Sequence, residues 1–143
     1  MTAKNQSKKE IDLAERIEEL QKKRESIEKQ ISEIKNLGEI APDGAWIVRY
    51  RARGQGGAYW YYKWQSKQAI FITKKGKNSC HKYIGKAGSS AFMKAIEMMV
   101  KRTKISALQQ VQYTLDLGLM DLVEESTRMK EKKGQEKSKS KNK

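Results

Sequence analysis

The chain has 143 residues with 31 basic and 17 acidic side chains, one cysteine and one histidine. A single cysteine excludes an intrachain disulfide, and one cysteine with one histidine cannot complete a zinc site of the usual ligand types. No segment reaches the roughly 20 apolar residues of a membrane-spanning helix, and the first residues lack the apolar core of a signal peptide. We therefore expect a cytoplasmic or nucleoid-associated protein with no metal, cofactor or small-molecule substrate and no membrane partner.

The positive charge is concentrated in two parts of the chain. Residues 38–104 carry 14 basic and 3 acidic side chains, and residues 128–143 carry 8 and 2. Lysine and arginine gain binding energy by releasing counterions from phosphate backbones, so this excess indicates a polyanionic partner. Nucleic acid is favoured over a merely solvated basic surface because the excess lies beside aromatic residues.

A helix is predicted from Ser7 to about Leu37, a segment rich in Glu, Lys, Gln, Ile and Leu. Its apolar residues recur at alternating steps of four and three, the heptad pattern of a coiled coil. The seam consists of Leu13, Ile17, Leu20, Ile27, Ile31 and Ile34, with Arg24 at the one charged position. We favour a homodimeric coiled coil; packing of the seam against the last helix of the same chain is the alternative.

The stretch from Gly44 to Gly85 holds all three tryptophans and all but one of the tyrosines, and it predicts a sheet. Two alternating runs flank a glycine-rich connection, which is typical of an antiparallel hairpin. Successive strand residues point to opposite faces. One predicted face, covered by a helix, holds Trp46, Val48, Tyr50, Ala52, Trp60, Tyr62 and Trp64. The open face would hold Arg49, Arg51, Arg53, Tyr59, Tyr61 and Lys63.

Two shorter runs, 69–73 and 79–84, flank a turn that contains Gly76 and Asn78. Glycine and asparagine favour turns, so an antiparallel β-meander of three or four strands is the simplest interpretation. The loop from Gly85 ends in serines that can cap a helix.

The next helix is predicted from about Ser90 to Arg102, with one apolar face that would cover the sheet. A second helix is predicted from Lys104 or Ile105 to about Met129, with Gly118 marking a break, a kink or a close helix contact. The lysine-rich remainder is expected to be disordered. The predicted fold is thus α+β, with a coiled-coil helix in 1–38, a sheet and helices in 39–129, and a basic tail in 130–143.

The residues that could carry catalysis are few. Cys80 and His81 are neighbours in a strand and point to opposite faces, so they do not form a nucleophile–base pair. We predict no catalytic residue.

Gly57-Ala58-Tyr59 followed by Tyr83-Ile84-Gly85-Lys86 and a basic helix resembles the signature of GIY-YIG endonucleases. In that family the two tyrosines and a helix arginine position the scissile phosphate, and a glutamate holds a metal ion. The resemblance implies such roles for Tyr59, Tyr83, Lys94 and either Glu124 or Glu125, and it makes a nuclease the alternative function.

The small sheet with arginines and aromatic residues, backed by a helix, is also similar to the arm-type DNA-binding domains of phage and transposon integrases and to small proteins of mobile elements. This resemblance implies DNA binding without catalysis. Strands can enter the major groove, where arginine reads guanine.

The leading hypothesis is a dimeric, non-enzymatic DNA-binding protein. Arginines of the open face would read the groove, lysines would contact phosphates, and the helix start near Ser89 would hold one phosphate. The predicted contact residues are Arg49, Arg51, Arg53, Tyr59, Tyr61, Lys63, Lys82, Lys86 and Ser89. RNA or single-stranded DNA stacked on Tyr59 and Tyr61 is a close variant. An adaptor that binds an acidic protein is the alternative without nucleic acid.

Overall fold

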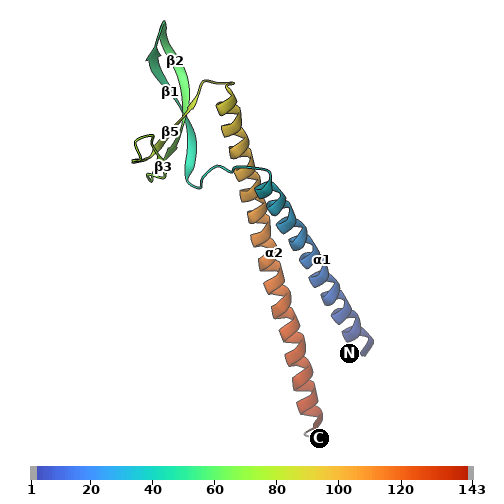
Figure 1. The fold of residues 1–143 in the computed structure, drawn as a ribbon. Coiled ribbons are helices and arrows are strands. Elements are labelled where there is room, and N and C mark those ends of the chain that lie inside the picture. Colours follow the sequence, from blue (N-terminus) through green and yellow to red (C-terminus); the bar gives the residue numbers. More distant parts are fainter. Residues whose placement is uncertain (1–2, 142–143) are drawn as a thin grey trace. The chain divides into compact units, whose positions relative to one another are not determined.

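The computed structural model of the chain describes residues 3–141 (Figure 1). The elements in this range are α1 Ala3–Asn36, β1 Ala45–Gly54, β2 Gly57–Ser66, β3 Phe71–Ile72, β4 Asn78–Ser79, β5 His81–Gly85 and α2 Ser90–Lys141. The fold class is α+β, as the sequence predicts.

The contacts within the chain define two compact units. The helical unit combines Met1–Glu33 with Ser106–Lys143, and the sheet unit is Ile34–Ile105. The first part of α2 belongs to the sheet unit and the remainder to the helical unit.

In the helical unit α1 and α2 lie side by side and run antiparallel (Figure 1). Ion pairs join the two helices in reverse order along the chain, which fixes both the direction and the register. They are Glu10 with Lys133, Arg16 with Glu125 at 2.9 Å, and Arg24 with Asp116 at 2.8 Å. Arg24, the charged residue in the heptad seam, thus has a carboxylate partner on α2.

The apolar seam of α1 packs within the chain. Leu13, Ile27 and Ile31 are buried, and Leu122 of α2 is buried in the same unit. This is the alternative that the sequence left open, in which the helix packs on the last helix of its own chain. The homodimer stays a prediction, and if it uses this seam it has to displace α2.

The C-terminal helix is longer than predicted. Helical backbone continues through Thr103, where the sequence predicts a boundary, and no proline interrupts the segment. The Thr103 hydroxyl donates to the Met99 carbonyl within the same helix. The helix also continues past Met129 to Lys141, where the sequence predicts a disordered tail. Lysine, glutamate and glutamine are good helix formers, and Lys133 pairs with Glu10 of α1. Residues 142 and 143 of the predicted tail lie outside the described range.

Gly118 lies within α2 at a close approach of the two helices. A Cβ built on Gly118 would lie 3.2 Å from Cδ1 of Leu20 on α1. The helix is not interrupted there. Of the three roles proposed from the sequence, close helix contact is therefore the one that the structure supports.

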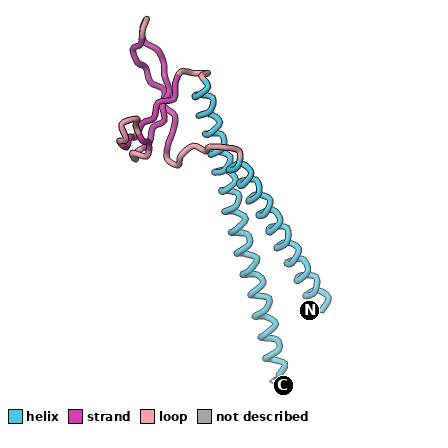
Figure 2. The backbone as a smooth tube through the Cα atoms, in the orientation of Figure 1, coloured by secondary structure: helices cyan, strands magenta, loops and turns pink. Residues whose placement is uncertain are grey.

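The sheet unit contains a three-stranded antiparallel sheet in the order β1–β2–β5. The short strands β3 and β4 lie between β2 and β5 along the chain, and they form a separate hairpin instead of joining the three-stranded sheet (Figure 2). The predicted antiparallel meander is therefore correct for three strands.

The register of the β1–β2 hairpin overturns the predicted composition of the two faces. Gly54 pairs with Gly57 across a two-residue turn, so every odd-numbered residue of β1 lies opposite an even-numbered residue of β2. Opposed residues in an antiparallel pair share a face. Arg49 therefore shares a face with Tyr62, and Tyr50 shares the other with Tyr61. The prediction paired the arginines with the wrong face of β2.

One face of the sheet is covered by the first part of α2. The buried core consists of Ala41, Ala45, Trp64, Phe71, Ile84 and Ala95, with Ile47, Tyr62 and Phe92 packed against it. Tyr62 and Phe92 meet edge to face at 4.8 Å between ring centroids. Trp46, predicted to lie under the helix, is on the opposite face and is exposed. The covered face is thus the one that also carries the arginines, farther along the hairpin.

Candidate nucleic-acid interface

The distal part of the β1–β2 hairpin is a two-stranded ribbon. β5 pairs with β2 only from Tyr62 to Gln65, so the pairs from Tyr50–Tyr61 to Gly54–Gly57 extend past β5 (Figure 2). Gly56 in the turn has φ +88°, a conformation that favours glycine. A two-stranded ribbon fits a DNA major groove, which is about 12 Å wide.

One side of this ribbon, here called the arginine face, consists of Arg49, Arg51, Arg53 and Trp60. The guanidinium carbon of Arg49 lies 4.2 Å from the centroid of the Trp60 ring, and that of Arg51 lies 5.4 Å away. Trp60 is 46% exposed, and the three arginines are exposed. Stacking on the indole restricts the two guanidiniums without neutralising them, so their charge stays available to a ligand.

The other side, here called the tyrosine face, consists of Tyr50, Tyr59, Tyr61 and Tyr83. Tyr61 lies between two other rings, with centroids 6.0 Å from Tyr50 and 6.2 Å from Tyr83. Two ammonium groups lie over these rings. Lys63 is 5.0 Å from the Tyr50 ring, and Lys86 is 4.6 Å from that of Tyr59 and 5.8 Å from that of Tyr61.

The remaining predicted contact residues do not gather at one place. Lys82 pairs with Trp64 in the register and so lies at the end of the sheet that α2 covers. Ser89 is the N-cap of α2, since its hydroxyl accepts a hydrogen bond from the Phe92 amide at 3.2 Å. Its part in phosphate binding stays a prediction. The nine predicted residues thus divide between two faces and a helix cap.

The electrostatics of the sheet unit are strongly one-sided. Ile34–Ile105 holds 15 basic side chains against the carboxylates of Glu39, Asp43 and Glu97. Lys94 of α2 pairs with Glu39 at 3.3 Å. Among the described residues, no ion pair includes a cation of β1, β2 or β5. The cations of the hairpin therefore have no carboxylate partner within residues 3–141.

Sequence reasoning missed several surface residues of this region. Trp60, Tyr50 and Tyr83 were not among the predicted contacts, because two were assigned to the covered face and one was considered only through a family resemblance. A two-residue turn between Gly54 and Gly57 would have given the register, and with it the correct partners. The turn between β3 and β4 adds a further exposed basic group, Lys74, Lys75 and Lys77.

The candidate catalytic groups differ in exposure and in the contacts that they make. Cys80 is half-buried, with its thiol 3.9 Å from the Lys67 carbonyl, and His81 is exposed. The part of the chain that the structure describes has no group of three or more His, Cys, Asp or Glu side chains able to hold a metal ion. Tyr59 and Tyr83, the tyrosines of the GIY-YIG resemblance, share the tyrosine face. Lys94, which stands near that family's arginine, is engaged with Glu39.

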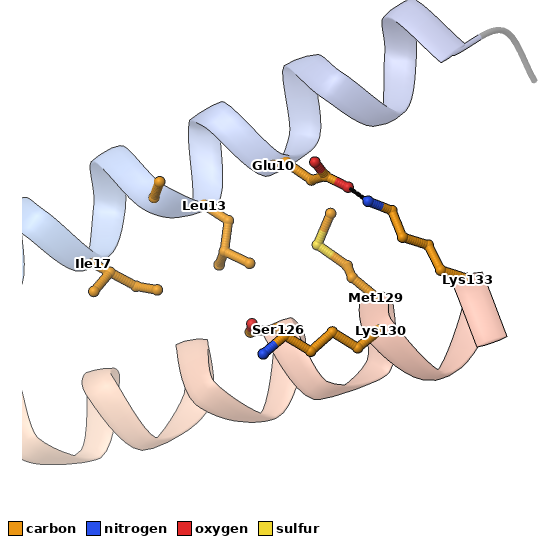
Figure 3. Close-up of a pocket in the computed structure, with 8 residues that line it drawn as sticks. Glu10, Leu13, Ile17, Ser126, Met129, Lys130 and Lys133 are labelled. Atoms are coloured by element: carbon orange, nitrogen blue, oxygen red, sulfur yellow. Dashed lines mark ion pairs between the residues drawn. The ribbon is translucent and has the colours of Figure 1, made fainter.

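A cavity of about 310 Å³ lies between α1 and α2 in the helical unit (Figure 3). Leu13, Ile17 and Met129 point into it, and the ion pair between Glu10 and Lys133 lies at one end. The lining is mainly apolar, and its carboxylate is already paired. We interpret the cavity as incomplete packing between the helices rather than as a reaction site.

The helices between residues 3 and 141 include none long and apolar enough to cross a membrane. Comparison of the chain with protein-family models, curated proteins and solved structures finds no match.

Proposed function

We propose that this protein binds duplex DNA through the arginine face of its β1–β2 hairpin and catalyses no reaction. One observation supports the proposal most directly. Arg49, Arg51 and Arg53 line one side of a two-stranded ribbon that extends past β5, and no carboxylate of the described residues pairs with them. The major groove admits a two-stranded ribbon, and an arginine in the groove can donate two hydrogen bonds to guanine.

The spacing of the arginines also fits a duplex. Alternate residues of an antiparallel strand are about 6.8 Å apart along its axis. Base pairs in DNA succeed one another every 3.4 Å or so, so alternate arginines would meet every second base pair. The guanidiniums of Arg49 and Arg51 lie 4.2 and 5.4 Å from the centroid of the Trp60 ring, which restricts both side chains before binding.

The lysines outside the ribbon would contact the DNA backbone. Lys74, Lys75 and Lys77 at the β3–β4 turn are exposed, as is Lys82 on β5. Phosphate contacts position a protein on the duplex without reading sequence, whereas contacts to base edges give specificity. We therefore assign base contacts to the arginine face and backbone contacts to these lysines.

The test compares two variants, each of which replaces three basic side chains. Arg49, Arg51 and Arg53 are changed to alanine in one variant. Arg128, Lys130 and Lys132, exposed on α2 in the helical unit, are changed to alanine in the matched control, which loses the same net charge. Binding of labelled duplex DNA is measured by fluorescence anisotropy, and far-UV circular dichroism verifies folding.

We expect the hairpin variant to lose on the order of a hundredfold or more in affinity, because each well-placed arginine contributes about 1–3 kcal/mol of base discrimination. The control should lose severalfold at most. Equal losses would mean that net charge alone drives binding and would reject the arginine face. If wild-type protein binds no nucleic acid, the adaptor for an acidic protein becomes the better proposal.

A further inference from the structure

The tyrosine face lies on the side of the hairpin that an arginine-face complex would leave free. Tyr50 and Tyr61 are directly opposed in the β1–β2 register, whereas Tyr83 of β5 is opposed to Lys63 and so lies diagonal to Tyr61 on the same face. The three rings thus form a row across three adjacent strands, with centroid spacings of 6.0 and 6.2 Å. The backbone pairing places all three rings on one face of the sheet.

The rings are accessible and do not cover one another. Tyr83 is 62% exposed and Tyr59 is 38% exposed, while Tyr50 and Tyr61 are half-buried. The planes of neighbouring rings are inclined by 34° and 50°, so no ring is stacked face to face on the next. Every nucleobase has a π-face, and aromatic rings on adjacent strands are a recurrent means of stacking two or three unpaired bases.

The cations beside the rings are placed to complement a phosphate backbone. Lys63 and Lys86 have their ammonium groups 4.6 to 5.8 Å from ring centroids. Their flexible stems let the ammonium groups move from the rings to phosphates when bases stack. β1, β2 and β5 contain no Asp or Glu, so no carboxylate on these strands repels the ligand.

We propose that the tyrosine face is a second nucleic-acid site, which binds unpaired bases of a single strand by stacking them on Tyr50, Tyr61 and Tyr83. The site goes beyond the proposed duplex site because it uses the opposite side of the hairpin and no arginine. Stacking is chemistry that single-stranded DNA and RNA share. A protein with both sites would recognise places where a duplex adjoins an unpaired strand.

The experiment uses fluorescein-labelled oligothymidine and oligouridine of 15 nucleotides and a duplex of equal length, measured by anisotropy with the full chain. One variant combines Tyr61→Leu with Tyr83→Leu, which keeps apolar bulk but removes both rings. A second combines Tyr61→Phe with Tyr83→Phe, which keeps the rings and removes only the hydroxyls. Tyr113→Leu, at a tyrosine 66% exposed on α2, is the matched control.

We expect the leucine variant to bind single strands on the order of tenfold more weakly for each ring that contacts a base. Its duplex affinity should change less than threefold. The phenylalanine variant and the Tyr113 control should bind single strands as the wild type does. The phenylalanine variant can still be interpreted if the leucine variant does not fold. The arginine-face variant should show the opposite selectivity.

Two results would overturn this inference. The first is wild-type single-strand affinity in a folded leucine variant. The second is loss of single-strand affinity in the phenylalanine variant, since stacking needs the ring and not the hydroxyl. Failure of the duplex proposal alone would appear as weak duplex binding with single-strand binding intact, so the two proposals can fail separately. Tighter binding of oligothymidine would indicate single-stranded DNA as the ligand, and tighter binding of oligouridine would indicate RNA.

Discussion

At the scale of single residues, the tyrosine face gives one of its members an altered ionisation. Partial burial raises the pKa of Tyr50 above its ordinary value of 10.0, and the neighbouring Tyr83 and Tyr61 raise it further. A negative charge on Tyr50 would lose hydration and would lie close to two other phenols that also become anionic at high pH. The folded protein therefore holds the Tyr50 proton more tightly than the unfolded chain does.

This ionisation predicts a pH effect on both spectrum and stability. In a titration followed by tyrosinate absorbance, Tyr50 should ionise late, and Tyr50→Phe should remove this late component while Tyr113→Phe keeps it. Because the folded pKa is the higher one, the contribution of Tyr50 to stability is present below about pH 10 and is lost as the pH rises through the folded pKa. An unchanged titration in Tyr50→Phe would show that another tyrosine is the perturbed one.

At the scale of elements, the helix α2 owes its close contact with α1 to a glycine. Gly118 leaves room for Leu20, since a Cβ on Gly118 would lie 3.2 Å from the leucine methyl carbon. A Cβ built on Gly134, which is also in α2, would have no heavy atom of a neighbouring residue within 4 Å. The same residue type thus serves a packing role at one position and none of this kind at the other.

Substitution of each glycine by leucine separates the two roles. Gly118→Leu should destabilise the protein by about 1–3 kcal/mol, the usual cost of overpacking. Gly134→Leu should be neutral or should stabilise by up to about 1 kcal/mol, because glycine is the poorer helix former. Chemical denaturation measures both free energies of unfolding. A loss of stability at Gly134 equal to that at Gly118 would contradict the packing role.

The sequence predicts element types better than their partners. Heptad spacing and β-alternation are local patterns, and they correctly indicate the α1 helix and the antiparallel β1–β2 pair. The faces of the hairpin were mispredicted because alternation fixes which residues share a face within a strand, whereas the turn decides which residues are opposed across strands. If the turn had one residue more or fewer, Tyr61 would share a face with the arginines and Trp60 would lie on the opposite face. The tyrosine face required the actual register and the position of β5.

At the scale of the whole molecule, the seam of α1 raises the question of self-association. A heptad seam has the same pattern whether its partner is a second copy or another helix of the same chain, so the sequence alone does not decide between them. The structure supplies an intrachain partner, α2, whose Asp116 also pairs with the charged seam residue Arg24.

Intrachain packing predicts that the midpoint of thermal unfolding is independent of protein concentration. A homodimer whose unfolding is coupled to dissociation would instead become more stable as the protein concentration rises, by mass action. Thermal unfolding over a hundredfold range of concentration, with sedimentation equilibrium at both ends, distinguishes the two. A midpoint that rises with concentration would support the homodimer that we favoured from the sequence.

The most direct test of the DNA-binding proposal is the affinity of the wild-type protein for duplex DNA across a salt series. Six to eight phosphate contacts predict a plot of log affinity against log salt with a slope of about −5 to −7. The expected result is a steep slope of this size in the wild type, with lower affinity but little change of slope in the Arg49, Arg51 and Arg53 alanine variant. Weak binding at low salt with a slope near zero would contradict DNA binding by this basic hairpin.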